Sequence, residues 1–242
     1  MIVLSVGMPR AGSGWHYNLI HDLMKTAGWM DAREVRLKFH LQNVLTEVNC
    51  NIGVLSARRL AMVAVPALLG HSFVIKAHSG PTRASRLLQG LGLLRVTYIY
   101  RDPRDAMLSA FDYGQRALAK GHPNAFSHLT DFEKSLAFVS DYVRIWENWM
   151  KQPGVLVTRY EDLLTDYDIQ AAHLFEYLKL DGADAKVREV IDQYRPGASE
   201  GQQGLHFYKG MIGRFRQSYS FEQQALLMKD FGAALARMGY GA

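Results

Sequence analysis

Short apolar runs alternate with longer stretches of helical periodicity along the chain. Four of these runs have the length and composition of buried strands, and each is followed by a turn; they cover residues 2–6, 73–75, 96–100 and 155–158. Between them, apolar residues recur at the spacing of amphipathic helices, as in residues 14–28. Such alternation is typical of a parallel sheet covered by helices. The pattern predicts an α/β fold, and the length suits a single domain over residues 1–242 better than two small ones.

Two helix starts have a clear local cause. Asp102 can cap a helix, and Pro103 suits the first helical position because its missing N–H would have no partner there. Ser220 and Gln223 have the spacing of a capping box, in which each side chain bonds the backbone N–H of the other residue. The second signal predicts a helix from about residue 221 to about residue 237.

Two other stretches are less regular. Residues 196–219 contain five glycines and no steady period, which predicts a long ordered loop, and such loops in compact domains are often functional. Residues 29–70 are expected to be helical, with boundaries that the pattern does not define. Residues 112–150 carry no motif with recognisable chemistry.

The composition is that of an ordinary globular protein, with 48% hydrophobic and 21% charged residues. The one cysteine, Cys50, excludes an internal disulfide and a cysteine metal cluster, and it suits a reducing compartment. The apolar start of the chain is too short for a signal peptide, and no run reaches the roughly 18 apolar residues of a membrane span. We therefore expect a cytoplasmic protein that needs no metal and has no membrane partner.

The charge balance indicates the kind of ligand. With 28 Lys and Arg against 23 Asp and Glu, the net charge is +5, which favours anionic ligands. The basic residues are scattered and form no tract of the kind that binds nucleic acid. A small, highly charged nucleotide is therefore a better match than DNA or RNA.

The turn after the first predicted strand is built to hold a phosphate. It has glycines at positions 7, 12 and 14, which let the backbone approach an anion closely, and it opens a helix whose N–H groups and dipole favour negative charge. The glycine spacing begins like a nucleotide-binding P-loop, but Ser13 stands where that loop has its lysine, and the basic residue, Arg10, lies inside the turn. The missing lysine argues against an ordinary ATP or GTP site with Mg²⁺.

Three readings of this turn stay open at this point. Its glycines can be incidental to a strand–turn–helix connection. The turn can belong to a P-loop-type kinase or nucleotidyltransferase, which would bind a nucleoside triphosphate with Mg²⁺. It can also belong to a nucleotide-binding module without catalytic activity. A dinucleotide site fits less well, because the glycine order differs from that of the dinucleotide fingerprint.

Residues after two other predicted strands supply a candidate second phosphate site and a candidate base. Arg101 follows one strand and Ser109 lies two turns into the next helix; an arginine can bind a phosphate with two hydrogen bonds, and a serine adds a donor. The alternative is a capped helix with a surface arginine. His78 follows another strand and has an ordinary pKa near ~6.5, so it is the best candidate for a base at neutral pH.

Several segments together resemble the sulfotransferases that use 3′-phosphoadenosine-5′-phosphosulfate (PAPS). Residues 8–15 resemble the family's 5′-phosphosulfate loop, Tyr-Pro-Lys-Ser-Gly-Thr-Thr-Trp, and residues 101–109 its 3′-phosphate motif, Arg-Asn-Pro-Lys-Asp-x-x-x-Ser. Residues 76–78 resemble its Lys-Thr-His, and residues 208–216 its loop Arg-Lys-Gly-x-x-Gly-x-Trp-Lys. A weaker match is Tyr-Glu-Asp at residues 160–162. The resemblance extends from residue 2 to about residue 240.

The resemblance implies roles for the residues near the 5′-phosphate. Arg10 takes the place of the family's loop lysine and contacts the 5′-phosphate and the bridging oxygen. His78 is the general base that removes the acceptor's proton, and Lys76 stabilises charge on the transferring group. The loop backbone, the Ser13 hydroxyl and a tryptophan packed on the adenine complete this side of the site; the implied residues are Arg10, Ala11, Gly12, Ser13, Gly14 and Trp15. Gly14 lacks the second hydroxyl of the family's loop.

The resemblance also implies the residues of the 3′-phosphate side. Arg101 and Ser109 bind the 3′-phosphate, and Tyr160 lies near the adenine. Lys209 and Gly210 belong to a loop that closes over the nucleotide. Tyr208 replaces that loop's arginine, so binding of the 3′-phosphate is expected to depend more strongly on Arg101.

The expected activity is transfer of a sulfuryl group from PAPS to a hydroxyl, less favourably a nitrogen, of a small-molecule acceptor, with 3′-phosphoadenosine-5′-phosphate (PAP) as product. The acceptor itself is open: a hydroxylated secondary metabolite, a phenol and a steroid-like alcohol all fit. In this family residues 29–70 and 112–150 are where the acceptor pocket is expected.

Overall fold

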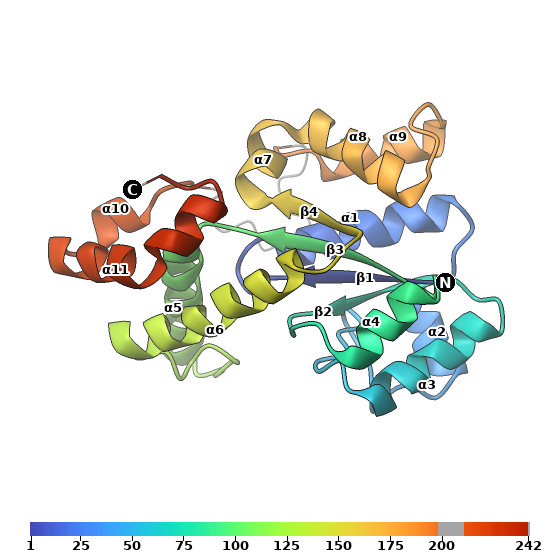
Figure 1. Ribbon diagram of the computed structural model, residues 1–242, viewed down its shortest axis with the longest axis horizontal. Coiled ribbons are helices and arrows are strands. Elements are labelled where there is room, and N and C mark those ends of the chain that lie inside the picture. Colours follow the sequence, from blue (N-terminus) through green and yellow to red (C-terminus); the bar gives the residue numbers. More distant parts are fainter. Residues whose placement is uncertain (198–210, 242) are drawn as a thin grey trace.

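Four parallel strands form the centre of the computed structural model, which describes residues 1–197 and 211–241 (Figure 1). Their order in the sheet is β2-β1-β3-β4. The strands are β1 (Ile2–Gly7), β2 (Phe73–Ala77), β3 (Leu94–Tyr100) and β4 (Val155–Arg159). All four predicted strands are confirmed, each extended by one or two residues, and so is the α/β fold class.

The helices lie on both faces of the sheet. They are α1 (Ser13–Thr26), α2 (Ala32–Lys38), α3 (Ala57–Leu68), α4 (Arg83–Gly90), α5 (Pro103–Ala119), α6 (Phe132–Met150), α7 (Tyr160–Thr165), α8 (Tyr167–Leu178), α9 (Ala185–Tyr194), α10 (Phe215–Ser218) and α11 (Phe221–Arg237). The predicted caps are present: the Asp102 side chain accepts from the Arg104 N–H, and Ser220 and Gln223 form a capping box.

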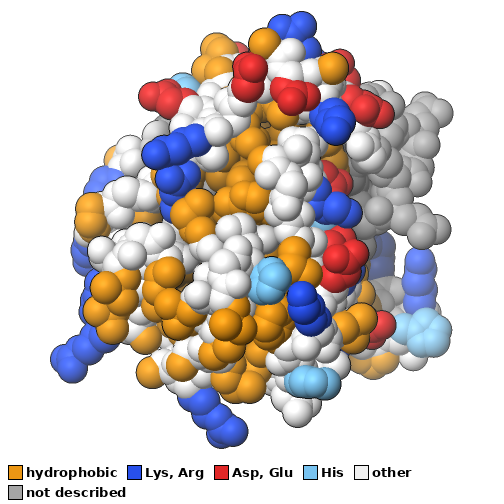
Figure 2. Space-filling model, turned by 90° about the vertical axis from the view of Figure 1, so that its right-hand side faces the viewer, with side chains coloured by type: hydrophobic (Ala, Val, Ile, Leu, Met, Phe, Trp, Pro, Cys, Tyr) orange, Lys and Arg blue, Asp and Glu red, His pale blue; other side chains and the backbone are white. Residues whose placement is uncertain are grey.

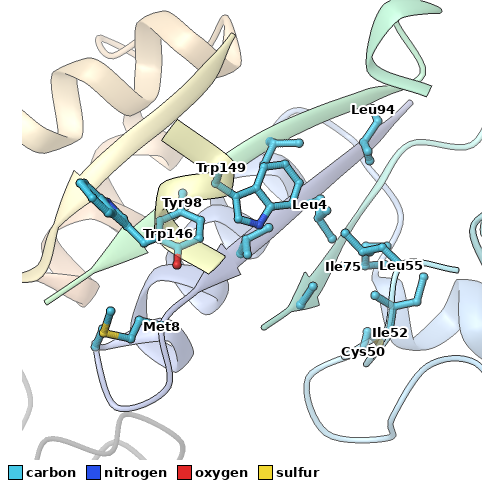
Figure 3. Packing of buried hydrophobic residues seen from close by; sticks show 14 of the residues in the cluster. Leu4, Met8, Cys50, Ile52, Leu55, Ile75, Leu94, Tyr98, Trp146 and Trp149 are labelled. Carbon is cyan, nitrogen blue, oxygen red and sulfur yellow. The ribbon is translucent and has the colours of Figure 1, made fainter. Parts of the chain in front are cut away.

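The alternation of side chains along the strands separates the core into two clusters. Ile2, Leu4 and Val6 of β1 face a cluster that includes α3, α6 and α11, part of which is shown in Figure 3. Val3, from the other face of β1, packs with side chains of α1, α8 and α9. Since successive strand residues point to opposite faces, β1 and β2 are buried on each side and β3 nearly so. The edge strand β4 is largely half-buried, with Val157 37% exposed.

Two expectations about irregular regions need correction. Residues 29–70 are helical only in α2 and α3, because His40, Cys50 and Gly53 between them take positive φ angles that a right-handed helix does not contain. The expected loop over residues 196–219 includes the short helix α10; residues 198–210 of it lie outside the described part.

Figure 2 shows the face of the molecule at the amino edge of the sheet, opposite the ends of the strands that the expected site residues follow. Hydrophobic side chains gather over its lower part and acidic ones mostly over its upper part. A cavity of about 650 Å³ at this edge is lined by residues such as Leu94, Arg95 and Tyr177, and it contains no residue of the expected site. Within residues 1–197 and 211–241, none of the helices is long and apolar enough to cross a membrane.

Candidate active site at the carboxyl edge of the sheet

The expected site residues follow the carboxyl ends of the parallel strands. These ends meet at one edge of the sheet, so the segments after β1, β2, β3 and β4 are brought together there. Ligands of open α/β sheets bind at this edge. Polar residues of neighbouring strands are also in register just before this edge: Ser5 of β1 lies between Lys76 of β2 and Thr97 of β3.

The glycine turn is pressed against its neighbours. A Cβ on Gly7 would lie 2.7 Å from the Ile99 side chain, and one on Gly12 would lie 2.6 Å from the Tyr160 ring. Gly12 also has φ +74°, and Arg10 has φ 64°, so the backbone is left-handed at both positions. Gly12 precedes α1 without any side chain of its own to cap that helix. The first-turn N–H groups of α1 therefore have the arrangement that suits an anion.

Arg10 links the turn to α5. Its Nε donates to the Ser109 hydroxyl at 3.3 Å, and its guanidinium lies 4.3 Å from the centre of the Tyr113 ring. Burial lowers the pKa of Arg10 from its usual value, with the charges of Arg116 and Arg101 acting in the same direction. The turn and the second motif, which are 99 residues apart in sequence, are thus in direct contact.

His78 is held with one ring nitrogen against the turn. Its Nδ1 lies 2.6 Å from the Gly7 carbonyl oxygen. Because a carbonyl oxygen only accepts, Nδ1 carries the proton, and the lone pair of the neutral ring lies on Nε2. Burial, followed by the charge of Lys76, lowers the pKa of His78 to about 4. The imidazole is therefore neutral at pH 7 and able to accept a proton at Nε2.

Lys76 is the buried cation of the site. Only 5% of the residue is exposed, and burial together with the charge of Arg10 lowers the pKa of its ammonium group to about 8. No carboxylate among the described residues forms an ion pair with it. Lys76 is in register with Ser5 of β1, whose hydroxyl is 3.1 Å from Nδ1 of the fully buried His16.

Arg101 is a second buried cation, at the end of β3. One terminal nitrogen donates to the Met211 carbonyl at 2.7 Å and lies 3.4 Å from the Asp105 carboxylate. Its guanidinium is 4.7 Å from the centre of the Tyr160 ring. Its Nε is buried and has no hydrogen-bond partner among residues 1–197 and 211–241. A buried cationic donor without a partner fits a site for a phosphate group.

A site with two arginines and a neutral histidine at the carboxyl edge of the sheet is consistent with the family to which the sequence is similar. The sequence matches the sulfotransferase domain family over residues 2–239. The chain belongs to the sulfotransferase domain family. The resemblance seen in the sequence motifs is thereby confirmed.

Known members of the sulfotransferase family differ considerably from this chain in sequence. Sulfotransferase 6B1 of Danio rerio is 22% identical over 154 residues, which are 59% of this chain and 52% of the relative. The chain therefore spans about half the length of this curated relative.

Solved sulfotransferase structures share the fold. Mouse sulfotransferase SULT7A1 complexed with PAP has a TM-score of 0.60 at 16% identity, covering 97% of this chain and 83% of that chain. Retinol dehydratase in complex with androsterone and the inactive cofactor PAP has a TM-score of 0.59 at 17% identity, covering 97% and 80%. Both structures cover 97% of this chain and confirm its predicted fold.

Trp15 and Tyr160, the two residues expected near the adenine, are both buried and lie next to each other. Trp15 is 3% exposed, stacks on Tyr167 with ring centres 6.1 Å apart, and donates its indole N–H to the Tyr194 carbonyl. It meets Tyr160 edge to face. Tyr160 in turn lies against Gly12 and Arg101. Adenine contacts at Trp15 and Tyr160 stay predictions.

The remaining site residues are only partly covered by the structure. Ala11 is fully buried, and α1 already begins at Ser13, so that Ser13 and Gly14, which were expected in the turn, form the first turn of the helix. Tyr208, Lys209 and Gly210 lie outside the described residues, and their expected contacts with the 3′-phosphate stay predictions.

Sequence reasoning missed Asp105, which stands in the motif but received no role. Its carboxylate accepts from the Gly213 N–H at 2.6 Å and from the Phe215 N–H at 3.0 Å. The signals in the sequence are its place in the motif and its position four residues after Arg101, with which it forms an ion pair. Its contact with residues 213–215 had no signal, because those residues are more than 100 positions away.

Proposed function

We propose that this chain transfers a sulfuryl group from PAPS to a hydroxyl group of a small-molecule acceptor. The observation that carries the proposal is that one edge of the sheet holds both a neutral His78, whose Nε2 can accept a proton, and two separate arginines that can bind anions. Arg10 lies in the glycine turn and Arg101 at the end of β3. PAPS carries its two phosphate groups at two positions of the ribose, which requires two such anion sites.

The residues present fit the donor nucleotide. The N–H groups at the start of α1, the Ser13 hydroxyl and Arg10 would bind the 5′-phosphate, because helix N-termini and guanidinium groups both favour phosphate oxygens. Arg101 would bind the 3′-phosphate through the Nε that has no partner in the described part of the chain, and Ser109 remains its predicted second donor. When bound, PAPS supplies the activated sulfuryl group.

The protein's part in the reaction is positioning, proton removal and charge stabilisation. The acceptor oxygen forms a bond to sulfur as the bond from sulfur to the bridging oxygen of the 5′-phosphate breaks. The acceptor proton goes to Nε2 of His78, and the negative charge that remains on the 5′-phosphate is stabilised by Arg10 and by the ammonium group of Lys76.

An aromatic series next to Arg10 supports an acceptor with an apolar ring system. The rings of Tyr113, Phe126, Phe138 and Tyr142 follow one another with centre-to-centre distances of 5.7, 5.7 and 5.0 Å. The series comes from α5, α6 and the segment between them, within the region expected to shape the acceptor pocket, and it begins on the guanidinium of Arg10. Retinol and androsterone, which appear in structures of retinol dehydratase, are alcohols of this apolar kind.

We therefore propose a phenol, a steroid-like alcohol or a hydroxylated secondary metabolite as acceptor, in a cytoplasmic protein. The alternatives of a P-loop-type kinase and of a non-catalytic binding module make different predictions in a thermal-shift test. A kinase would be stabilised by ATP with Mg²⁺, whereas a sulfotransferase would be stabilised by PAP without metal.

The decisive experiment is His78→Ala, assayed with PAPS and a panel of aryl and alicyclic alcohols. We expect turnover to fall by 10²-fold or more, the usual contribution of a general base, while the affinity for PAP stays within a few-fold. His173→Ala, at an exposed histidine of α8 near the amino edge of the sheet, is the matched control and should retain full activity. Near wild-type sulfation by the His78 variant would refute the base assignment, and absence of PAP binding by the wild type would refute the proposed function.

A further inference from the structure

The carboxylate of Asp105 is the meeting point of three donors. Asp105 lies in the first turn of α5 and is 1% exposed. One oxygen accepts from the Phe215 N–H at 3.0 Å; the other accepts from the Gly213 N–H at 2.6 Å and lies 3.4 Å from Arg101. A buried carboxylate is costly unless it is fully bonded, and here both oxygens have partners.

The segment that Asp105 holds is fastened to α5 at several further points. The Met211 carbonyl accepts from Arg101 at 2.7 Å, and Arg214 forms an ion pair with Asp112 at 2.7 Å. The guanidinium of Arg104 lies 4.1 Å from the centre of the Phe215 ring. Residues 211–215 are thus joined to β3 and α5, from which they are separated by about a hundred positions in sequence.

Arg101 connects the attachment of residues 211–215 to the proposed 3′-phosphate site, because it contacts Asp105 and Met211 and is itself the proposed phosphate ligand. Asp105 and Met211 both engage the same terminal nitrogen of its guanidinium, so together they fix the plane in which its Nε lies. A carboxylate next to a phosphate would oppose phosphate binding by like-charge repulsion, yet the N–H groups of Gly213 and Phe215 offset the charge of Asp105. The arrangement keeps the arginine oriented while its Nε, which has no partner within residues 1–197 and 211–241, stays available.

We propose that Asp105 is a positioning residue for the 3′-phosphate: its carboxylate fastens residues 213–215 to α5 and orients Arg101 toward that phosphate. This inference rests on the proposed function and assigns one part of it to a residue that does not contact the nucleotide. It predicts that Asp105 matters only for nucleotides that carry a 3′-phosphate.

The test compares the affinities of PAP and of 5′-AMP, which lacks the 3′-phosphate, by calorimetry. Asp105→Asn keeps the size of the side chain but turns an NH₂ group toward one of the two backbone N–H groups, so at least one charge-assisted hydrogen bond is lost. We expect the Kd of PAP to rise at least tenfold, with the Kd of 5′-AMP unchanged within twofold. In turnover, the KM for PAPS should rise while kcat at saturation changes little.

Two further arms separate positioning from a general loss of structure. In the Arg101→Ala background, Asp105→Asn should add little to the loss of PAP affinity, because residues that act through one another are not additive. Asp168→Asn, which removes an exposed ion pair to Arg195 outside this attachment, is the matched control and should change the Kd of PAP less than threefold.

The attachment itself can be tested without nucleotide. Hydrogen exchange at the Gly213 and Phe215 amides should be faster in Asp105→Asn than in the wild type, and unchanged exchange would refute the anchoring role. Equal losses for PAP and 5′-AMP, or additive effects with Arg101→Ala, would overturn the assignment to the 3′-phosphate. A wild type that binds neither nucleotide would instead refute the proposed function, whatever the exchange result.

Discussion

Lys76 provides a prediction in which stability and activity change in opposite directions. The residue is 5% exposed, and the pKa of its ammonium group is lowered from 10.5 to about 8, first by burial and then by the charge of Arg10. This difference corresponds to roughly 3 kcal/mol of free energy against folding, since one pKa unit is about 1.36 kcal/mol. Lys76→Met removes the buried charge and keeps an unbranched side chain of similar length.

The sign and the pH range follow from linkage. Between pH 8 and 10.5 the unfolded chain binds more protons at Lys76 than the folded chain, so the stability of the wild type rises with pH through this interval. Below about pH 8 both states are protonated and the full cost of burying the charge applies. We therefore expect Lys76→Met to exceed the wild type in free energy of unfolding by roughly 3 kcal/mol at pH 7, with the difference disappearing toward pH 10.5.

The measurements are urea and thermal denaturation of both proteins at several pH values between 6.5 and 10, with PAPS turnover at pH 7. At neutral pH the variant should melt roughly 6–12 °C higher, by the usual relation for domains of this size, while its turnover falls by at least tenfold. Lys151→Met, at an exposed lysine after α6, should change stability by less than about 0.5 kcal/mol. A Lys76 variant no more stable than the wild type, or a difference independent of pH, would refute the reasoning.

Two other predictions concern the pH dependence of turnover and the glycine turn. If His78 must be neutral and Lys76 protonated, kcat/KM for PAPS should rise with pH around 4, stay level, and decrease again around pH 8. Lys76→Arg should remove the decrease at alkaline pH. A loss of kcat/KM that already begins when the pH is lowered through 6 would contradict the low pKa of His78. Gly12→Ala should abolish PAP binding in calorimetry and lower stability, because its Cβ would lie 2.6 Å from the Tyr160 ring; Gly121→Ala, with a similar φ and open space around it, should show only the backbone strain and keep its PAP affinity.

The sequence alone determined most of the framework and the chemistry of single residues. The four predicted strands are short runs rich in apolar and β-branched residues, with few polar interruptions such as Ser5 and Thr97, and this pattern identifies them without any tertiary information. The caps at Asp102 and Ser220 are equally local. Arg10, His78 and Arg101 were also found locally, since each follows the carboxyl end of a strand.

Only the tertiary structure decided how these groups behave. The Nδ1 proton of His78 is fixed by a carbonyl 71 positions away, and the pKa values of His78 and Lys76 follow from burial that no local pattern expresses. The anchoring of residues 213–215 by Asp105 spans more than 100 positions. Local sequence determines backbone propensity and residue chemistry, whereas protonation, tautomer and orientation depend on contacts that form when distant segments meet at the edge of the sheet.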